Sequence, residues 1–184
     1  MAKKLTVRDM TIIGMLAALV VIGTTIKIPY GTGAMVHLGS AAIFTSAILF
    51  GGVYAGFAGA IGSAFFDLLM GFSPYTIWSF FIKGIAGLVA GSIAHSGGAE
   101  GRSLARNIAA CVIGAAWTLA GYIVAWTAVI GKFQVALANT PSSLMTSTAG
   151  LIVAIPLSVA LRKALEAAKI TKPGKPGRRE SGRL

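Results

Sequence analysis

Residues 107–130 have the sequence NIAACVIGAAWTLAGYIVAWTAVI, which contains no charged side chain. A helix crosses the hydrocarbon core of a bilayer with about 20 predominantly apolar residues, so this segment is long enough to span a membrane. Further apolar runs lie on both sides of it. The sequence therefore predicts an all-α integral membrane protein, a compact bundle of six transmembrane helices.

The composition agrees with that prediction. Hydrophobic residues make up 55% of the 184 residues and charged residues only 11%, whereas a soluble domain of this size needs more polar surface. The 24 glycines would weaken soluble helices but allow close helix packing in lipid. The single cysteine, Cys111, cannot form an internal disulfide and is interpreted as inert packing.

Apolar runs separated by Gly, Pro and polar clusters set the expected helix boundaries. We expect helices at about Asp9–Lys27, Ser40–Phe50, Tyr54–Met70, Tyr75–Ala94, Asn107–Ile130 and Ser143–Leu161. Residues 28–39, which contain Gly and Pro, and residues 131–142 are expected to be outer loops. Residues 1–168 then form one transmembrane domain, and residues 169–184 form a basic tail whose Pro and Gly content predicts disorder.

The basic residues predict the orientation. Three precede the first helix, Arg102 and Arg106 lie between the fourth and fifth, and eight follow the sixth. With six helices, these 13 of the 16 Lys and Arg residues fall on one side, whereas five helices would divide them. Basic residues concentrate on the cytoplasmic side, so both termini are predicted to be cytoplasmic. The net charge of +11 is therefore interpreted as topology rather than as a nucleic-acid surface.

Small residues recur at helical spacing on three predicted helices. Gly14 and Ala18 lie four apart on the first helix. Longer rows occur on the third and fourth helices: Gly52, Gly56, Gly59 and Ala60; Ala55, Gly59 and Ser63; and Gly84, Gly87 and Gly91. Such rows let helix backbones approach closely. Packing within the bundle is the first interpretation of each row, and a docking face for another membrane protein is the alternative.

Two ionisable residues fall inside predicted helices, Asp67 in the third and Lys83 in the fourth. Charged side chains inside a membrane are costly and mark functional sites. At a helical rise of about 1.5 Å per residue, both lie about 9–14 Å below the outer end. Lys83 shares a helix face with Gly87 and Gly91, which directs it into the bundle. Two roles remain open: a buried ion pair that fixes helix register, or contacts to a ligand.

Aromatic and polar side chains gather toward the same outer half. Tyr122 and Trp126 share one face of the fifth predicted helix. An interfacial aromatic belt explains part of this set, but Tyr122 lies deeper and suits stacking on a planar ligand. The predicted ligand site comprises Tyr30, His37, Asp67, Trp78, Lys83, Tyr122, Trp126, Asn139 and Thr146.

The sequence lacks the motifs of catalysis. No G-x-x-x-x-G-K-[ST] motif for binding ATP is present. No cluster of His, Cys and acidic residues has metal-ligand spacing, and neither a metal nor a cofactor is predicted. No inverted repeat is evident, which disfavours a self-sufficient secondary transporter. We therefore expect the chain to have no enzymatic activity of its own.

Four stretches resemble a known family. They are VHLGS at 36–40, FGGVYAG at 50–56, GSAFFDLLMG at 62–71 and FIKGIAGL at 81–88. They are similar to stretches of the substrate-specific S components of energy-coupling factor (ECF) vitamin transporters, in the riboflavin-transporter-like branch. The resemblance covers the six predicted helices and is most specific between His37 and Gly91. It does not cover the tail beyond about Lys169.

The resemblance implies an S component in the plasma membrane of a prokaryote that binds a water-soluble vitamin or precursor near the outer face. It implies docking onto a membrane scaffold subunit that carries two ATPase subunits, as in an ABC importer. The docking motif of small residues corresponds to Gly14 and Ala18, with Gly in place of the usual first Ala. The bound S component would then topple in the bilayer and release its ligand to the cytoplasm.

The substrate and some rival functions stay open at this point. Relatives handle pyrimidine precursors of thiamine, pyridoxine, riboflavin, folate or cobalamin. The aromatic residues and the buried acid and base favour a small planar heterocycle such as the first three, with cobalamin or folate less favoured. The main alternative is an autonomous channel or facilitator for small solutes; a small membrane enzyme and a scaffold without a ligand are further alternatives.

Overall fold

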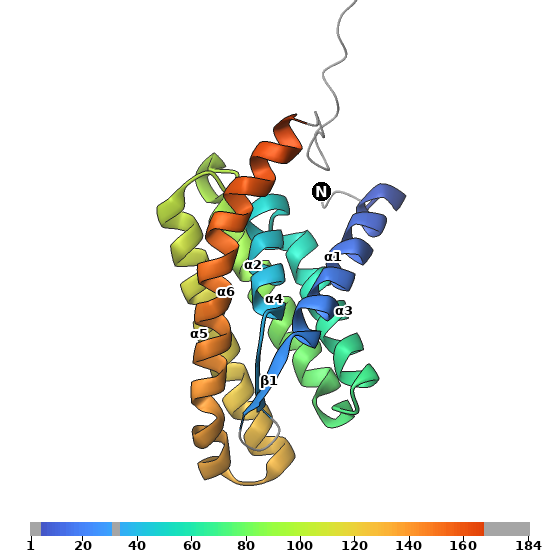
Figure 1. Cartoon of the computed structure of the whole chain (residues 1–184), viewed down its shortest axis with the longest axis vertical. Coiled ribbons are helices and arrows are strands. Elements are labelled where there is room, and N and C mark those ends of the chain that lie inside the picture. Colours follow the sequence, from blue (N-terminus) through green and yellow to red (C-terminus); the bar gives the residue numbers. More distant parts are fainter. Residues whose placement is uncertain (1–4, 31–33, 168–184) are drawn as a thin grey trace, which may run out of the picture.

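The computed structural model describes residues 5–30 and 34–167 and contains six α-helices within them (Figure 1). The elements are α1 (Val7–Thr25), β1 (Lys27–Tyr30), β2 (Ala34–His37), α2 (Gly39–Phe50), α3 (Gly52–Leu69), η1 (Ser73–Tyr75), α4 (Thr76–His95), η2 (Ser96–Gly98), α5 (Leu104–Ile130) and α6 (Phe133–Ala167). Every α-helix except α2 is long and apolar enough to cross a membrane. The predicted fold class, a helical membrane bundle, is confirmed.

The two ends of the described chain lie at one end of the molecule. Figure 1 shows the start of α1 and the end of α6 together, opposite the tip of the β-hairpin. This arrangement agrees with an even number of helical segments. We refer to the end with the termini as cytoplasmic, on the basis of the basic residues there, and to the hairpin end as outer.

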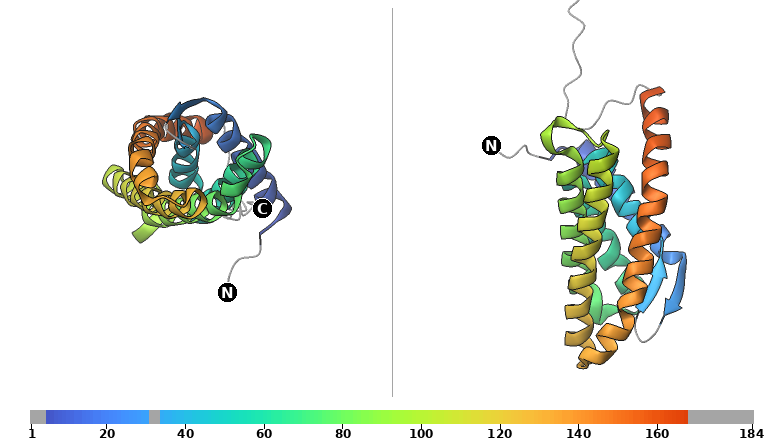
Figure 2. Two further views of the ribbon diagram at one scale, coloured as in Figure 1. Left: turned by 90° about the horizontal axis from the view of Figure 1, so that it is seen from below. Right: turned by 90° about the vertical axis from the view of Figure 1, so that its left-hand side faces the viewer.

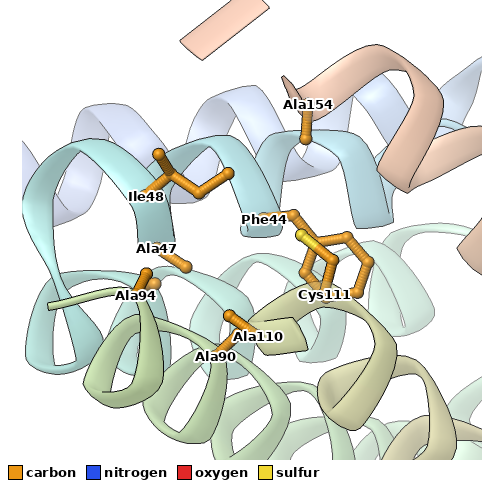
Figure 3. Packing of buried hydrophobic residues seen from close by; sticks show 9 residues of the cluster. Phe44, Ala47, Ile48, Ala90, Ala94, Ala110, Cys111 and Ala154 are labelled. Atoms are coloured by element: carbon orange, nitrogen blue, oxygen red, sulfur yellow. The ribbon is translucent and has the colours of Figure 1, made fainter. Parts of the chain in front are cut away.

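Helix α2 is short and forms the centre of the bundle. Figure 2 shows it inside the ring of the other helices when the molecule is viewed from the outer end. In its cytoplasmic half it packs into a cluster of buried side chains (Figure 3): Phe44, Ala47, Ile48, Ala55, Ala90, Ala94, Ala110, Cys111 and Ala154. The thiol of Cys111 thus takes part in the core, as expected of inert packing. The cluster belongs to the hydrophobic core of the bundle.

Glycines bring α3 and α4 into close contact. A Cβ atom on Gly59 would lie 2.7 Å from the backbone oxygen of Lys83. A Cβ on Gly87 would collide with the backbone of Ala55, and one on Gly91 with the backbone of Gly52. Because backbone atoms cannot move aside as a flexible side chain can, these positions require glycine. The rows of small residues on α3 and α4 are therefore packing faces within the bundle, as first interpreted.

This close approach predicts a large stability difference between two glycines. We expect Gly91→Ala to lower the midpoint of thermal unfolding in detergent, since overpacking a tight contact costs about 1–3 kcal/mol or more. Gly14→Ala is the matched control, because no atom lies within 4 Å of a Cβ placed there. Equal unfolding midpoints for the two variants would contradict the observed α3–α4 packing.

The expected loop at 28–39 is instead a β-hairpin, so this prediction was wrong. Strands β1 and β2 pair antiparallel, with Lys27 opposite His37 and Tyr30 opposite Ala34. The segment KIPY at 27–30 and the segment AMVH at 34–37 supply the aromatic and β-branched residues that favour strands. Pro29 and the nearby glycines obscured this pattern in the sequence. Figure 2 shows the hairpin beside the outer half of α6.

Helix α6 begins ten residues before the predicted start, so the expected outer loop at 131–142 is largely wrong. The helix runs through Pro141 and Pro156. Each proline removes one backbone hydrogen bond, but nearby hydroxyls bond to backbone carbonyls: Ser142 donates to Asn139 O and Ser158 to Ile155 O, both at 2.8 Å. Such bonds let transmembrane helices tolerate proline. The predicted tail at 169–184 lies outside the described residues.

Candidate functional site

A cavity lies in the outer half of the bundle, between the hairpin and α3–α6. Its volume is about 60 Å³, and it opens to solvent. The wall draws on every α-helix except α2: Thr24, Met35, His37, Ser63, Phe66, Asp67, Phe72, Tyr75, Ser79, Lys83, Thr118, Tyr122, Trp126, Ser142, Ser143 and Thr146. Polar and aromatic groups therefore converge in one place.

Lys83 is the buried cation of this cavity, with 3% of its surface exposed. Its Nζ donates a hydrogen bond to Ser40 Oγ at 3.1 Å and lies 5.4 Å from the centre of the Tyr122 ring. An ammonium group has three N–H donors. The bond to Ser40 uses one of them and the ring attracts the charge, so the group can still donate to a ligand.

Asp67 is the buried anion, with 7% of its surface exposed. Its Oδ2 atom has no hydrogen-bond partner among the described residues. The side chain lines the same cavity as Lys83, yet the salt bridge found in the described part of the chain joins Arg102 and Glu166 at 2.8 Å. A buried carboxylate oxygen without a partner is costly. Asp67 and Lys83 therefore stand apart on one cavity wall instead of closing an ion pair.

His37 is oriented by the start of α2. Its Nδ1 accepts a hydrogen bond from the backbone N–H of Gly39 at 3.1 Å. Desolvation by the surrounding protein, followed by the positive charges of Lys83 and Lys27, lowers the pKa of His37 to about 3. The imidazole is therefore neutral near pH 7, and because Nδ1 accepts, Nε2 carries the proton. His37 adds a neutral donor to the cavity wall.

Aromatic rings form much of the remaining wall. The rings of Tyr122 and Trp126 lie 5.5 Å apart, and the hydroxyl of Tyr122 is hydrogen-bonded to Ser79 Oγ at 2.9 Å. Phe66 and Phe72 form a stacked pair, with 6.4 Å between their centres. Planar walls of this kind suit a planar ligand.

Lys27 ties the hairpin to this wall. Its Nζ lies 4.8 Å from the centre of the Phe66 ring and 5.2 Å from that of Phe72. These distances are within the range of cation–π attraction. The hairpin residues Met35 and His37 are thereby held over the cavity that they line.

The structure places six of the nine predicted site residues on the cavity wall: His37, Asp67, Lys83, Tyr122, Trp126 and Thr146. The other three do not line it. Tyr30 lies at the end of β1, Trp78 is half-buried on α4 beside the inward-facing Ser79, and Asn139 is buried within α6. Neighbouring residues of a helix point about 100° apart, which explains why Ser79 faces the cavity and Trp78 does not.

Several wall residues were missed by sequence reasoning, although they follow a simple pattern. Each of four helices carries two polar wall residues one turn apart: Ser63 and Asp67, Ser79 and Lys83, Thr118 and Tyr122, Ser142 and Thr146. Residues four apart share a helix face. Looking for hydroxyl residues four positions before the predicted site residues Asp67, Lys83, Tyr122 and Thr146 would have found them.

The predicted docking residues Gly14 and Ala18 are exposed on α1. The large apolar residues Met15, Leu19 and Ile22 are exposed on the same helix. This contrasts with the rows on α3 and α4, which are packed inside the bundle. The outer surface of α1 therefore combines small residues with bulky apolar side chains and is available to lipid or to another helix.

A groove on α3 and α4 differs from the polar cavity in the chemistry of its lining. Its lining is apolar throughout: Val53, Gly56, Phe57, Ala60, Phe80, Phe81, Gly84, Ile85 and Leu88. With no polar side chain to orient a water-soluble ligand, this groove fits contact with lipid better than a specific binding site. The polar cavity is thus the stronger candidate.

Comparisons with known proteins agree with this geometry. Residues 4–163 match the model of a family described as the S component of the ECF-type riboflavin transporter. No curated protein sequence matches the chain at a significant level.

Two solved structures share the fold. One, described as the S component of a bacterial ECF transporter, has a TM-score of 0.70 at 18% identity and covers 86% of this chain and 98% of its own. The other, ThiT from Listeria monocytogenes, has a TM-score of 0.60 at 19% identity and covers 86% and 96%. At these identities the likeness concerns the fold.

Proposed function

Because the chain belongs to the family of ECF-type riboflavin transporter S components, we propose that it captures a water-soluble vitamin or vitamin precursor in its outer cavity. S components are substrate-binding subunits of transporters and not enzymes. One observation carries the proposal. Two buried side chains of opposite charge, Asp67 and Lys83, lie on the wall of the same cavity without forming an ion pair, and aromatic rings form much of the remaining wall. Buried polar groups that converge beside aromatic rings are typical of small-molecule sites.

The ligand is a small planar heterocycle. Tyr122, Trp126 and the stacked pair Phe66 and Phe72 supply flat apolar surfaces for a ring. Lys83 and the Nε2 of His37 supply donors, and Asp67 supplies an acceptor. These groups fix the orientation of a ring that the aromatic side chains hold.

Delivery of the ligand to the cytoplasm requires partner subunits. A membrane scaffold subunit with two ATPase subunits binds the exposed face of α1 around Gly14 and Ala18, and the loaded S component topples to release its ligand in the cytoplasm. The exposure of these two residues supports this role, since a partner helix can approach a small residue closely. The ATPase subunits supply the energy.

The cytoplasmic half of the bundle favours this proposal over a channel. The buried apolar cluster around Phe44, Ile48 and Cys111 lies below the cavity, where a channel for a water-soluble solute would need polar, hydrated walls. A channel would transport solute in liposomes that contain this chain alone. An S component would bind ligand but transport it only with the ATPase module and ATP, and uptake by the chain alone would contradict the proposal.

Tryptophan fluorescence provides the binding test. We expect titration with a panel of vitamins and precursors to change the emission of the detergent-purified protein, because Trp126 lines the cavity. Trp126→Phe should remove most of the change. The matched control Trp78→Phe should keep it, because Trp78 does not line the cavity. A signal that depends on Trp78 and not on Trp126 would place the ligand elsewhere.

A further inference from the structure

We infer that Asp9 and Tyr54 form a contact that sets the orientation of α1 in the bundle, and that this contact turns Gly14 and Ala18 outward for docking. The inference rests on the proposed function, because it concerns the face of α1 that the proposal assigns to the scaffold subunit. It names two positioning residues, which line neither the ligand cavity nor the docking face. Its support comes from the contact itself, from the chemistry of the two faces of α1 and from the register of α1 along α3.

A hydrogen bond joins the cytoplasmic ends of α1 and α3. The hydroxyl of Tyr54, in the first turn of α3, donates to Asp9 Oδ1 at 2.6 Å. An O–H···O bond of this length is typical of an ionised acceptor. Asp9 is 5% exposed, whereas the apolar residues Val7 and Met10 beside it are exposed. The carboxylate therefore turns into the bundle at a level where other side chains of α1 face outward.

The other carboxylate oxygen of Asp9 has a separate role. Asp9 Oδ2 accepts hydrogen bonds from the backbone N–H and the hydroxyl of Thr6, at 2.9 and 2.8 Å. Together with the bond from the Asp9 N–H to Thr6 Oγ1, these form a capping box at the start of α1. The cap does not involve Tyr54. The bond between the two helices can therefore be removed without removing the cap.

The apolar side chains of α1 do not distinguish an inward face from an outward one. Leu16 and Val20 are buried, while Met15 and Leu19 are exposed, and all four are apolar. Lipid tails are as apolar as leucine, so the bilayer gives no hydrophobic preference for burying one face over the other. A charged group on one face does give a preference, because its exposure to lipid is costly. Asp9 is the charged side chain on the buried face of α1.

The docking residues lie on the opposite side of α1 from Asp9. Successive residues of a helix are rotated by about 100°, so Ala18, nine positions after Asp9, lies about 180° from it. Gly14, five positions after Asp9, lies about 140° from it. Both residues are exposed. Holding Asp9 against Tyr54 therefore turns Gly14 and Ala18 away from the bundle.

A second contact between α1 and α3 lies at a matching level of the two helices. A Cβ atom on Gly62 would lie 2.6 Å from the backbone oxygen of Ala17. Ala17 follows Asp9 by eight residues, and Gly62 follows Tyr54 by eight, which is about 12 Å along each helix. Figure 1 shows that α1 and α3 run in the same direction. Close packing at Ala17 locates the middle of α1, and the bond from Asp9 to Tyr54 fixes its cytoplasmic end.

Binding of the scaffold–ATPase complex from the same organism to the full-length protein in lipid nanodiscs tests the inference. We expect Tyr54→Phe to weaken this binding about 5- to 100-fold, because it removes one hydrogen bond to a charged group and thereby lowers the fraction of molecules oriented for docking. Its ligand affinity should stay that of the wild type. Ser92→Ala is the matched control and should bind the complex normally, because the exposed Ser92 hydroxyl donates to Leu88 O within its own helix.

A double-mutant cycle separates orientation of α1 from a general loss of stability. In the Asp9→Ala background, Tyr54→Phe should weaken binding of the complex no further, because the two residues act through one bond. Asp9→Asn, which keeps the side-chain shape, serves if the alanine variant does not fold, and the effect of Tyr54→Phe should then be reduced. A role limited to stability would lower the midpoint of thermal unfolding while the affinity for the complex stays unchanged, and this result would overturn the inference.

Gly14→Leu in the same assay separates this inference from the proposed function. Normal binding of the complex by Tyr54→Phe, with binding lost in Gly14→Leu, would overturn the role of Tyr54 and leave docking on α1 standing. Normal binding by Gly14→Leu as well would contradict docking on α1 itself. Loss of ligand affinity in Tyr54→Phe would also overturn the inference, because the effect would then not be confined to α1.

Discussion

Replacing Gly14 or Ala18 with leucine is expected to abolish uptake of the ligand while its binding affinity stays unchanged. Both residues lie on the exposed surface of α1, four residues apart. Among the α1 residues only Thr24, at the outer end of the helix, lines the cavity. Close approach of two transmembrane helices depends on small residues at their contact. A leucine side chain at this contact would hold the scaffold subunit away from α1.

The measurement is uptake by cells or proteoliposomes that contain the complete transporter, together with affinity of each purified variant. Ala116→Leu on α5 is the matched control, since Ala116 is also an exposed alanine on a transmembrane helix. It should transport normally. Normal uptake by both α1 variants would show that the partner binds a different face, and loss of affinity in these variants would show that their effect is not confined to docking.

Replacing Lys83 with methionine is expected to weaken ligand binding by about 10- to 100-fold, because a hydrogen bond to a charged group contributes about 1.5–3 kcal/mol. The affinity of Thr11→Ala should remain that of the wild type. Thr11 is exposed on α1, and its hydroxyl donates to the backbone oxygen of Val7, far along the helix from the cavity.

Thermal unfolding separates a binding role of Lys83 from a structural one. Methionine is similar in length and apolar, and a buried charge that is not closed into an ion pair is costly, so its removal is not expected to destabilise the fold. The midpoint of unfolding of Lys83→Met should therefore be unchanged or higher without ligand. A lower midpoint with wild-type affinity would assign Lys83 to fixing the helices in place, the other role that the sequence left open.

Most of the helices could be predicted from the sequence, but the structure at the outer end of the bundle could not. The run without charged residues at 107–130 and the other long apolar runs predict transmembrane helices, because a helix that crosses a bilayer needs about 20 predominantly apolar residues. The start of α6 was missed because Gln134, Asn139 and Pro141 are typical of a loop, whereas in the structure nearby hydroxyls satisfy carbonyls and the helix continues. The hairpin was missed because strands of four residues give a weak periodic signal.

The site residues that could be predicted from the sequence are those of types that are rare inside membranes. Asp67 and Lys83 stand out because charges inside a bilayer are costly. Hydroxyl residues such as Ser79 and Thr118 do not stand out, since serine and threonine occur throughout transmembrane helices and bond to their own backbone. Their place on the cavity wall depends on which face each helix turns inward. That Asp67 and Lys83 remain apart depends on helix packing, which spacing along the chain does not determine.

The most direct test of the central claim is native mass spectrometry of the full-length protein, purified in mild detergent from its native membranes without added ligand. If the cavity captures a water-soluble vitamin or vitamin precursor, the spectrum will show the protein with one bound molecule of that mass. The bound fraction will be much lower in Lys83→Met and unchanged in Ala116→Leu. A folded protein that carries no small molecule and acquires none from the panel would contradict the account, and its family membership would then describe its fold alone.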